Sequence, residues 1–432
     1  MQKDRPRRFL EIFAAILKHS NYRFLLDIYS RIATKCGRCS CMCQVYEETG
    51  DPEDVPCYRS ELLLRVYRRH FTLGGMLYGK IFGNRYLADK DIDEMAEAFY
   101  RCTACRRCSI ECPMGIDHGL ITRLGRYILS EMGIAPKALV VSTREQLEGA
   151  TRNTSAIPVK ALLDSCEFLE EEILEAKGVP VKFPINVEGA EYIFFPPVSD
   201  YLMEAETLMG NAVVLHAAGI SWTIGTGYTD AINYGLFYND RLLANIARKE
   251  VEELHRLQAK KILIGECGHA SRAAKYFIPT FCGGKQAPEV VNCMELTLRL
   301  LEQGRLKLNP KAITETVTYH DPCNIARTGW IIEQPRTIIK SFIKNFVEMS
   351  PNKISNYCCG GGGGTVSVDE IRRFRTEVAG KRKAEQLRAT GADIVIAPCA
   401  NCKKQLRELI QDYGLEMEVK GLHDLIFTAI EF

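Results

Sequence analysis

The pattern of apolar and polar positions changes near residue 190. Before that point, apolar residues recur at helical spacing over residues 5–33, 120–132 and 161–177. This spacing predicts amphipathic helices. The first stripe fits a helix packed on its own domain, and it also fits a helix that docks on a membrane partner. Its members are Phe9, Leu10, Ile12, Phe13, Ile16 and Leu17.

After residue 190, short apolar runs predict buried strands over 191–195, 261–264, 317–320 and 393–396. Helical patterns over 239–259 and 368–389 lie between the strands of each pair. Because the same order of strand, helix and strand occurs twice, we predict two related α/β lobes rather than a solenoid. The predicted fold is an α/β double lobe with a pseudo-twofold repeat, preceded by an α-helical domain.

Composition narrows the class of protein. The chain has 432 residues, of which 46% are hydrophobic and 25% charged, and its net charge is +2. A nucleic-acid-binding protein usually carries a basic excess, so this balance gives no support for that class. No segment approaches the ~18–20 uninterrupted apolar residues of a membrane helix. Residues 7–10 resemble part of a twin-arginine export signal, but Glu11 and Lys18 interrupt the apolar run, so we interpret them as mature protein.

Cysteine usage changes the picture most, because the chain contains 18 cysteines. A chain of this length can bury a core without disulfides, and many of the cysteines are separated by two residues. Both features favour thiolate ligands in a reducing compartment. One run, C-x₂-C-x₂-C-x₃-C-P, matches the bacterial ferredoxin motif for a [4Fe–4S] cubane. It consists of Cys102, Cys105, Cys108 and Cys112, followed by Pro113.

A second, imperfect cysteine motif precedes this run. Cys36, Cys39 and Cys43 match its second, third and fourth positions, but Ala33 occupies the first, and Cys57 is the nearest spare cysteine. In two-cluster ferredoxins the fourth cysteine of each motif binds the other cluster. We therefore predict one cubane on Cys36, Cys39, Cys57 and Cys112, and another on Cys102, Cys105, Cys108 and Cys43. Cys41 competes with Cys39 or Cys43 as a ligand, and a Cys₄ zinc site is the alternative to the cubanes.

A third group of cysteines lies in the C-terminal lobe. Cys358 and Cys359 run directly into five glycines, Gly360 to Gly364. Glycines allow a close approach of the backbone or a positive φ. A flexible linker with incidental thiols is the alternative interpretation. Other cysteines stand at the end of a predicted strand or in a turn, so we interpret five as ligands of one iron–sulfur centre: Cys323, Cys358, Cys359, Cys399 and Cys402.

The two lobes differ at these positions. When the two lobes are aligned, Val198 corresponds to Cys323 and Ala270 corresponds to Cys402. Residues 221–225 correspond to the segment that contains Cys-Cys-Gly. Of the five ligand positions, the first lobe keeps a cysteine only at Cys267, which corresponds to Cys399 of the second lobe. His269 lies two residues after Cys267. The first lobe therefore cannot hold the same centre. Cys267 and His269 are either an inert remnant or catalytic residues that face the other lobe's site, where they could bind a metal or donate a proton.

The spacing of these cysteines resembles a known family. The order of these cysteines is similar to the CCG domain of heterodisulfide reductases. A cysteine is followed after 34 residues by Cys-Cys-Gly, and 39 residues separate Cys359 from a Cys-x-x-Cys. The order of a two-cluster ferredoxin module and paired lobes resembles the catalytic iron–sulfur subunit of the membrane-bound form of that enzyme. It is most similar to the iron–sulfur subunits of the Dsr, Tmc and Hmc membrane redox complexes of sulfur-metabolising prokaryotes. The segment 320–324 and the glycine run carry this match.

The resemblance implies a function. The five CCG cysteines would bind a noncubane [4Fe–4S] cluster that reduces a disulfide or trisulfide, such as a heterodisulfide or the trisulfide of a DsrC-like small protein. Electrons would come from a membrane cytochrome b, with or without a multihaem cytochrome c, through the two cubanes. The chain would lie peripherally on the cytoplasmic side of the inner membrane. His320, His269 and Arg327 are candidates for proton donation or thiolate stabilisation.

Two other functions remain open from the sequence. One is a non-catalytic subunit that only relays electrons, and the other is a glycolate-oxidase-like iron–sulfur subunit with a flavoprotein partner. The glycolate-oxidase-like group normally keeps both CCG lobes in fuller form than the organisation predicted for this chain. That organisation comprises N-terminal docking helices (1–35), a two-cluster ferredoxin-like domain (36–135), a helical connector (136–190), a degenerate CCG lobe (191–310) and a CCG lobe with the noncubane cluster (311–432).

Overall fold

The computed structural model describes residues 4–82 and 87–432, and the chain divides into two compact units. The first comprises Met1–Lys137, Phe237–Asp240 and Gly360–Lys381, and the second comprises Ala138–Leu236, Arg241–Cys359 and Arg382–Phe432. The division is therefore not simply N-terminal and C-terminal. The glycine run that follows Cys359 belongs to the first unit, whereas Cys359 itself belongs to the second.

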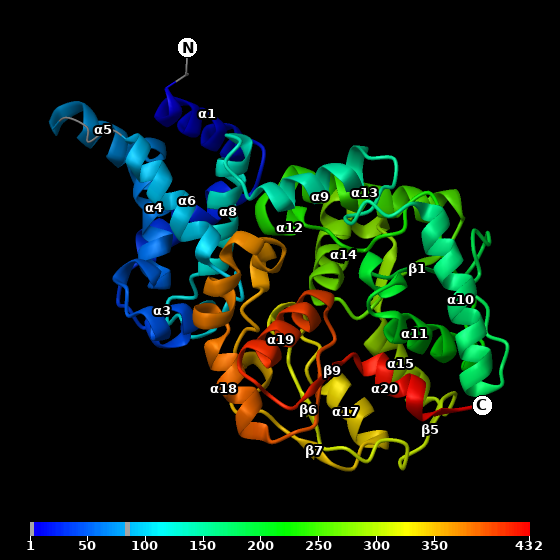
Figure 1. Ribbon diagram of the computed structural model, residues 1–432. Coiled ribbons are helices and arrows are strands. Elements are labelled where there is room, and N and C mark those ends of the chain that lie inside the picture. The colour runs from blue at the N-terminus through cyan, green and yellow to red at the C-terminus, as the bar shows by residue number, and fades with distance from the viewer. Residues whose placement is uncertain (1–3, 83–86) are drawn as a thin grey trace. The chain divides into compact units, whose positions relative to one another are not determined.

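The first unit is helical. Its helices are α1 (Arg5–Lys18), α2 (Tyr22–Ile32), α3 (Gln44–Thr49), α4 (Pro56–Phe71), α5 (Leu73–Phe82), α6 (Asp89–Arg101), α7 (Arg107–Ile110) and α8 (His118–Glu131). The stripe of α1 faces the core of the unit, where Phe9 and Phe13 are fully buried. The helix therefore packs on its own unit, as the first interpretation of the stripe expects. In contrast, α5 exposes Leu73, Leu77 and Ile81, and it extends outward from α4 (Figure 1).

The second unit contains two parallel sheets of the same topology, β2-β1-β3-β4 and β7-β6-β8-β9. The first sheet comprises β1 (Tyr192–Phe195), β2 (Trp222–Thr223), β3 (Lys261–Ile264) and β4 (Glu289–Asn292). The second comprises β6 (Val317–Tyr319), β7 (Phe346–Val347), β8 (Ile394–Ile396) and β9 (Glu418–Lys420). A helical region followed by an α/β region with parallel sheets confirms the predicted fold class.

Helices and one small ribbon complete the second unit. The helices are α9 (Lys137–Glu148), α10 (Val159–Lys177), α11 (Ala205–Ala217), α13 (Asp240–Arg256), α14 (Gly268–Phe281), α15 (Cys293–Glu302), α16 (Cys323–Ala326), α17 (Glu333–Phe342), α18 (Lys381–Thr390), α19 (Ala400–Asp412) and α20 (Leu422–Ala429). The short helix α12 (Gly235–Tyr238) has residues in both units. The ribbon pairs β5 (Lys307–Leu308) with β10 (Ile430–Glu431). Helices α11 and α20 are far apart in sequence but pack side by side (Figure 1). Their backbones lie very close, because a Cβ added to Gly210 of α11 would lie 2.0 Å from the carbonyl oxygen of His423 of α20.

The helix predicted over 368–389 is α-helical only in α18. A 3₁₀ turn (Asp369–Ile371) and a π-helical turn (Phe374–Ala379) precede it. The backbone of Gly360 lies close to the π-helical turn, because a Cβ added to Gly360 would lie 2.7 Å from the carbonyl oxygen of Arg375. Gly360 also has a φ of +98°, which only glycine adopts readily. Tertiary packing against the glycine run thus overrides the helical pattern. None of the described helices is both long and apolar enough to span a bilayer.

Candidate functional site

The lining of one cavity of the first unit includes Cys36, Cys39, Cys57 and Cys112. Cys57 lies in the first turn of α4, and Cys112 follows α7. Cys41 does not line the cavity. Its thiol is exposed and donates a hydrogen bond to the carbonyl oxygen of Arg38 at 3.1 Å. The structure thus gathers the four cysteines that the sequence grouped for the first cubane, and their role as ligands stays a prediction.

The lining of a second cavity of the same unit includes Cys43, Cys102, Cys105 and Cys108. The loop that carries the last three turns tightly, with positive φ at Ala104 (50°) and Arg106 (64°). The Ala104 N–H donates a hydrogen bond to the Cys102 Sγ at 3.3 Å. The fourth cysteine of each motif therefore lies with the other motif, the crossing that two-cluster ferredoxins use.

The charge around the second cavity suits thiolates. Arg59 is buried and lines this cavity. Burial opposes its charge, but Cys102, Cys43 and Cys108 outweigh burial and raise its pKa. Each cavity thus offers four thiols, and a buried cation accompanies the second set. This donor chemistry fits two [4Fe–4S] cubanes, because cluster thiolates carry negative charge that a nearby cation stabilises.

The C-terminal lobe brings a further set of ligand atoms together. The ligand atoms of His320, Cys359 and Cys402 all lie within 4.8 Å of one another, and all three residues are buried. His320 follows β6, and Cys402 lies in the first turn of α19, after β8. The carboxyl ends of parallel strands are where sites form in open α/β sheets. Side-chain hydrogen bonds from Cys358, Cys402 and His320 lower the pKa of the Cys359 thiol well below its usual value.

Cys323 and Cys399 occupy different places around this group. Cys399 precedes α19 and is buried, and hydrogen bonds from Cys267 and Cys402 lower the pKa of its thiol. Cys402 therefore lies between Cys359 and Cys399. Cys323 begins α16 and is only partly buried, and it belongs to neither close group of ligand atoms found in the described residues. The structure thus gathers four of the five CCG cysteines tightly, with Cys323 on the adjoining turn.

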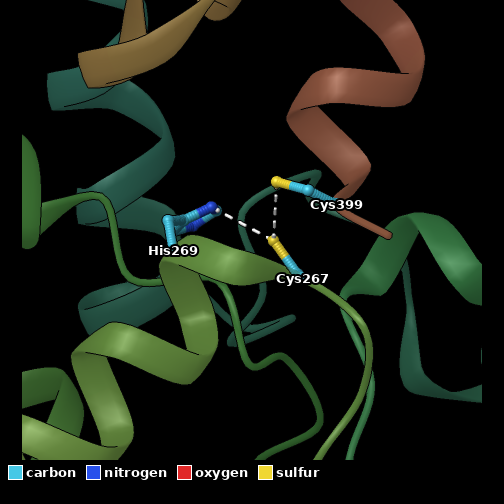
Figure 2. A group of neighbouring side chains, drawn as sticks. All are labelled: Cys267, His269 and Cys399. Carbon is cyan, nitrogen blue, oxygen red and sulfur yellow. Dashed lines mark hydrogen bonds between the residues drawn. The ribbon is translucent and has the colours of Figure 1, made fainter. Parts of the chain in front are cut away.

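The retained residues of the first lobe lie at the same site. Figure 2 shows the Cys267 Sγ between the His269 ring and the Cys399 Sγ, at 3.2 Å from Nδ1 and 3.9 Å from the sulfur. Both residues come from the turn between β3 and α14. Cys267 and His269 therefore face the CCG cysteines of the second lobe, as the pseudo-symmetry of the sequence predicts.

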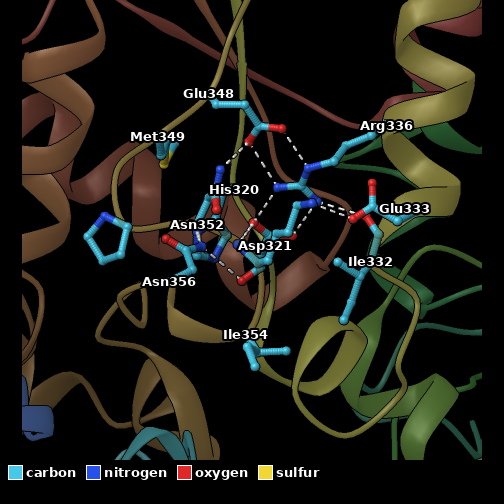
Figure 3. A network of polar contacts seen from close by, with 12 residues as sticks. His320, Asp321, Ile332, Glu333, Arg336, Glu348, Met349, Asn352, Ile354 and Asn356 are labelled. Atoms are coloured by element: carbon cyan, nitrogen blue, oxygen red, sulfur yellow. Dashed lines mark hydrogen bonds and ion pairs between the residues drawn. The ribbon is translucent and has the colours of Figure 1, made fainter.

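A buried polar network supports the segment before Cys358 (Figure 3). Arg336 forms a bidentate pair with Asp321, at 2.9 and 2.8 Å, and its Nε donates a hydrogen bond to Glu348 at 2.6 Å. Asn356 donates hydrogen bonds to the Asp321 carbonyl oxygen at 3.1 Å and toward the His320 Nδ1 at 3.3 Å. Asp321 thus fixes the turn between His320 and Cys323.

Two basic residues complete this support. Arg327, a candidate for proton donation, instead donates hydrogen bonds to the carbonyl oxygens of Ile354 and Asn356, at 3.0 and 2.6 Å. Sequence reasoning missed Lys383. Its buried Nζ donates a hydrogen bond to the Asn356 Oδ1 at 2.7 Å, and burial lowers its pKa to about 7. A lysine on an amphipathic pattern gives no sign of such burial, so the sequence carried no signal for it.

Comparisons with known proteins agree with this geometry. Residues 34–116 match a 4Fe-4S dicluster domain, and residues 317–407 match the CCG cysteine-rich domain. An Hdr-like menaquinol oxidoreductase iron-sulfur subunit 2 of Archaeoglobus fulgidus is 28% identical, over 98% of this chain and 84% of its own length. The D subunit of a dihydromethanophenazine:CoB–CoM heterodisulfide reductase of Methanosarcina mazei is 27% identical, over 92% and 93%.

The dicluster domain implies two cubane clusters, and it coincides with the region that carries the two four-cysteine cavities. The CCG domain coincides with the second sheet and its buried cysteines. The chain thus combines a 4Fe-4S dicluster domain with a CCG domain, and it is a distant relative of Hdr-like menaquinol oxidoreductase iron–sulfur subunits and of the D subunit of heterodisulfide reductase.

Proposed function

We propose that this chain is the iron–sulfur subunit of a membrane-associated redox complex and that its second lobe opens a sulfur–sulfur bond. One observation carries this proposal: the buried sulfur atoms of Cys359 and Cys402 converge with His320 at the carboxyl ends of β6 and β8. The name of one relative, a heterodisulfide reductase subunit, points to this class of reaction, and the name of another, a menaquinol oxidoreductase subunit, points to a redox complex.

The ligand sets follow from this proposal. Cys36, Cys39, Cys57 and Cys112 hold one cubane, and Cys43, Cys102, Cys105 and Cys108 hold the other. Cys323, Cys358, Cys359, Cys399 and Cys402 hold a noncubane [4Fe–4S] cluster. A bound iron–sulfur centre supplies electrons one at a time and an iron that can hold a thiolate.

The chain's own residues position the substrate sulfur and its protons. Reductive opening of one disulfide consumes two electrons and two protons and yields two thiols. Lys383 donates a hydrogen bond to Asn356, Asn356 contacts His320, and His320 contacts Cys359. These polar groups form a continuous buried row that ends at the sulfur site. The row can hold protons beside Cys359 while bulk water is excluded.

The route for electrons follows the chain. Gly363 lies four residues after Cys359, and its carbonyl oxygen accepts a hydrogen bond from Arg126 at 2.8 Å. Arg126 also donates a hydrogen bond to the carbonyl oxygen of Cys102. The glycine run therefore follows the CCG cysteine pair in the chain, and within the first unit Arg126 bonds both to this run and to the second cubane motif. This connection supports a relay in which the two cubanes feed the third centre.

The finer assignment concerns partners and substrate. We place the chain in a Dsr-, Tmc- or Hmc-type complex with a membrane cytochrome b, with or without a multihaem cytochrome c, on the cytoplasmic side of the membrane. The exposed apolar residues Leu73, Leu77 and Ile81 of α5 suit contact with a membrane subunit. The substrate would be a heterodisulfide or the trisulfide of a DsrC-like small protein.

Spectroscopy of two variants tests the ligand sets. Anaerobically purified Cys359→Ser should lose the signal of the noncubane centre in electron paramagnetic resonance (EPR) and keep both cubane signals. Cys105→Ser should lose one cubane signal and keep the noncubane centre. If Cys359→Ser leaves every signal unchanged, the ligand assignment for the third centre is wrong.

Activity separates catalysis from a simple relay. Chemically reduced protein should cleave a model disulfide or persulfide, and thiol added to oxidised protein should produce a new EPR signal. A pure relay subunit would do neither. Co-purification with a flavoprotein instead of a cytochrome b would favour the glycolate-oxidase-like alternative.

A further inference from the structure

Cys267 belongs to the lobe that lacks its own ligand set, yet its sulfur lies at the other lobe's site. The Sγ atoms of Cys267 and Cys399 are 3.9 Å apart. Two thiolates on one tetrahedral metal, with bonds of about 2.3 Å, lie about 3.8 Å apart. The separation therefore allows both sulfurs to bind the same metal atom without rearrangement of the backbone.

The fold holds this sulfur in place through both lobes. Cys267 and Cys399 occupy equivalent positions, each immediately before a helix that follows a central strand, α14 after β3 and α19 after β8. The start of α14 packs tightly on α16, because a Cβ on Gly268 would lie 2.9 Å from the Ile325 Cγ1. The helix that begins with Cys323 thus presses against the turn that carries Cys267.

A side-chain contact reinforces this docking. The Nη1 of Arg272, on α14, donates a hydrogen bond to the Asn324 Oδ1 at 3.0 Å, one residue after Cys323. Together with the Gly268 contact, this bond leaves the turn little freedom to move away from the second lobe. The position of Cys267 is therefore built by the fold and does not depend on one flexible side chain.

Cys267 and His269 are polar side chains in a buried position, where an inert remnant would be expected to carry apolar side chains. Both are buried, at 1% exposure each. Their contact, at 3.2 Å between Sγ and Nδ1, and the stacking of the His269 ring on Tyr234, with centroids 5.8 Å apart, fix the imidazole beside the sulfur. Burying an imidazole is unfavourable unless it has a polar partner. A pair of apolar side chains would fill this space more stably, so the pair points to a ligand.

We propose that Cys267 is a sixth cysteine ligand of the noncubane centre, supplied by the degenerate lobe, and that His269 orients its sulfur. This inference rests on the proposed function, because it needs the five CCG cysteines to hold that centre. It changes the character of the site. The centre is shared by the two lobes, so the first lobe contributes directly to the metal and is not merely a scaffold.

Selenium at residue 267 gives a direct test. Full-length protein with selenocysteine in place of Cys267, purified anaerobically with its clusters, is examined by X-ray absorption at the selenium edge. We expect an iron neighbour at bonding distance from selenium. Only carbon and nitrogen neighbours would overturn the inference, and so would zinc, which would indicate a separate mononuclear site on Cys267, His269 and Cys399.

Serine variants provide the second measurement. Cys267→Ser should alter the EPR and Mössbauer signals of the third centre and leave both cubane signals, which arise in the first unit, unchanged. Cys166→Ser, a change at an equally buried cysteine outside every motif, should match the wild type. Identical third-centre spectra in Cys267→Ser and wild type would overturn the inference.

His269 acts through Cys267, so its test uses a potential. His269→Leu should shift the midpoint potential of the third centre, and His269→Gln, which keeps a hydrogen-bonding group, should restore part of the shift. An unchanged potential in His269→Leu would contradict the orienting role. A wild-type protein with no third centre would instead refute the proposed function, whereas a third centre without a selenium–iron contact would refute only the sixth ligand.

Discussion

Arg126 donates a hydrogen bond from its Nη1 to the carbonyl oxygen of Gly363 at 2.8 Å. The same buried guanidinium donates hydrogen bonds to the carbonyl oxygens of Phe99, at 2.9 and 2.7 Å, and of Phe237, at 3.3 Å. One side chain thus joins three segments of the first unit that are distant in sequence. Arg126, on α8, thus bonds to the backbone of the glycine run.

Arg126→Met should therefore destabilise the first unit. The substitution leaves several buried carbonyl groups without a donor, and we expect a loss of about 3 kcal/mol in the free energy of unfolding. Thermal or urea unfolding measures the change. Arg144→Met, at a more exposed arginine, is the control and should change stability by less than about 0.5 kcal/mol. Equal stability of the two variants would show that the buried bonds of Arg126 contribute nothing.

Serine variants of Cys57 and Cys41 together test which cysteine is a ligand of the first cubane. Cys57 lines the cavity with Cys36, Cys39 and Cys112, whereas the exposed thiol of Cys41 points to the Arg38 carbonyl oxygen. Cys57→Ser should remove one of the two cubane EPR signals, and Cys41→Ser should keep both. Iron analysis gives the same comparison independently. The opposite result would move the ligand from Cys57 to Cys41.

Lys383 should tune the third centre through its charge. The ammonium is fully buried, and its hydrogen-bond acceptors are Asn356, Gln386 and Met349. Burial opposes its charged form, and Asp321, followed by the thiols of Cys359 and Cys358, favours it. Lys383→Met should make the midpoint potential of that centre more negative, on the order of tens of millivolts, because a nearby positive charge stabilises the reduced state. An EPR-monitored redox titration measures the shift.

The control for that titration is Lys340→Met, which removes an exposed lysine of the same unit. Its potential should equal that of the wild type, since water and salt screen exposed charges. A shift of the same size in both variants would mean that net charge, and not the buried position of Lys383, sets the effect.

Glu250 predicts a pH dependence unrelated to the cysteine sites. Both of its carboxylate oxygens are buried without a hydrogen-bond partner among the described residues, and burial raises its pKa well above 4.5. The folded protein keeps this carboxyl protonated at pH values where the unfolded chain has lost the proton. Stability from this group is therefore fully present below pH 4.5 and falls as the pH rises.

Glu250→Gln should remove the loss of stability that occurs as the pH rises. We expect it to stabilise the protein at pH 8 by on the order of 1–3 kcal/mol and to have a progressively smaller effect toward pH 5. Thermal unfolding across this range measures the difference. Glu252→Gln, at an exposed glutamate on the same helix, should show no such trend. A gain for Glu250→Gln that is constant with pH would contradict the ionisation argument.

The exposed apolar face of α5 predicts a binding defect. Leu77 and Ile81 are 59% and 71% exposed. Leu77→Lys with Ile81→Lys should reduce co-purification with the membrane fraction several-fold and leave all cluster signals unchanged, because neither side chain packs in the core. Val141→Lys with Phe168→Lys changes exposed apolar residues elsewhere and serves as the control. Equal retention in both double variants would exclude α5 as the contact.

The amino-acid sequence by itself determined the fold class and the grouping of the cysteines. Apolar periodicity is local, so β1, β3, β6 and β8 and the helices α8, α10 and α13 lie where the pattern predicts. The tight loop of Cys102, Cys105 and Cys108 is also encoded locally, by its spacing. The weaker predictions concern residues 368–379, where packing against Gly360 produces 3₁₀ and π turns in place of an α-helix.

Only the tertiary structure decided which distant residues meet. Lys383 is buried beside Asn356, Arg126 bonds to the carbonyl oxygen of Gly363, and the Cys267 sulfur is held 3.9 Å from that of Cys399. These relationships join segments more than a dozen residues apart, and each depends on how helices and strands pack. The sequence pattern specifies each element and its apolar face, but long-range packing sets which side chains those faces bring together.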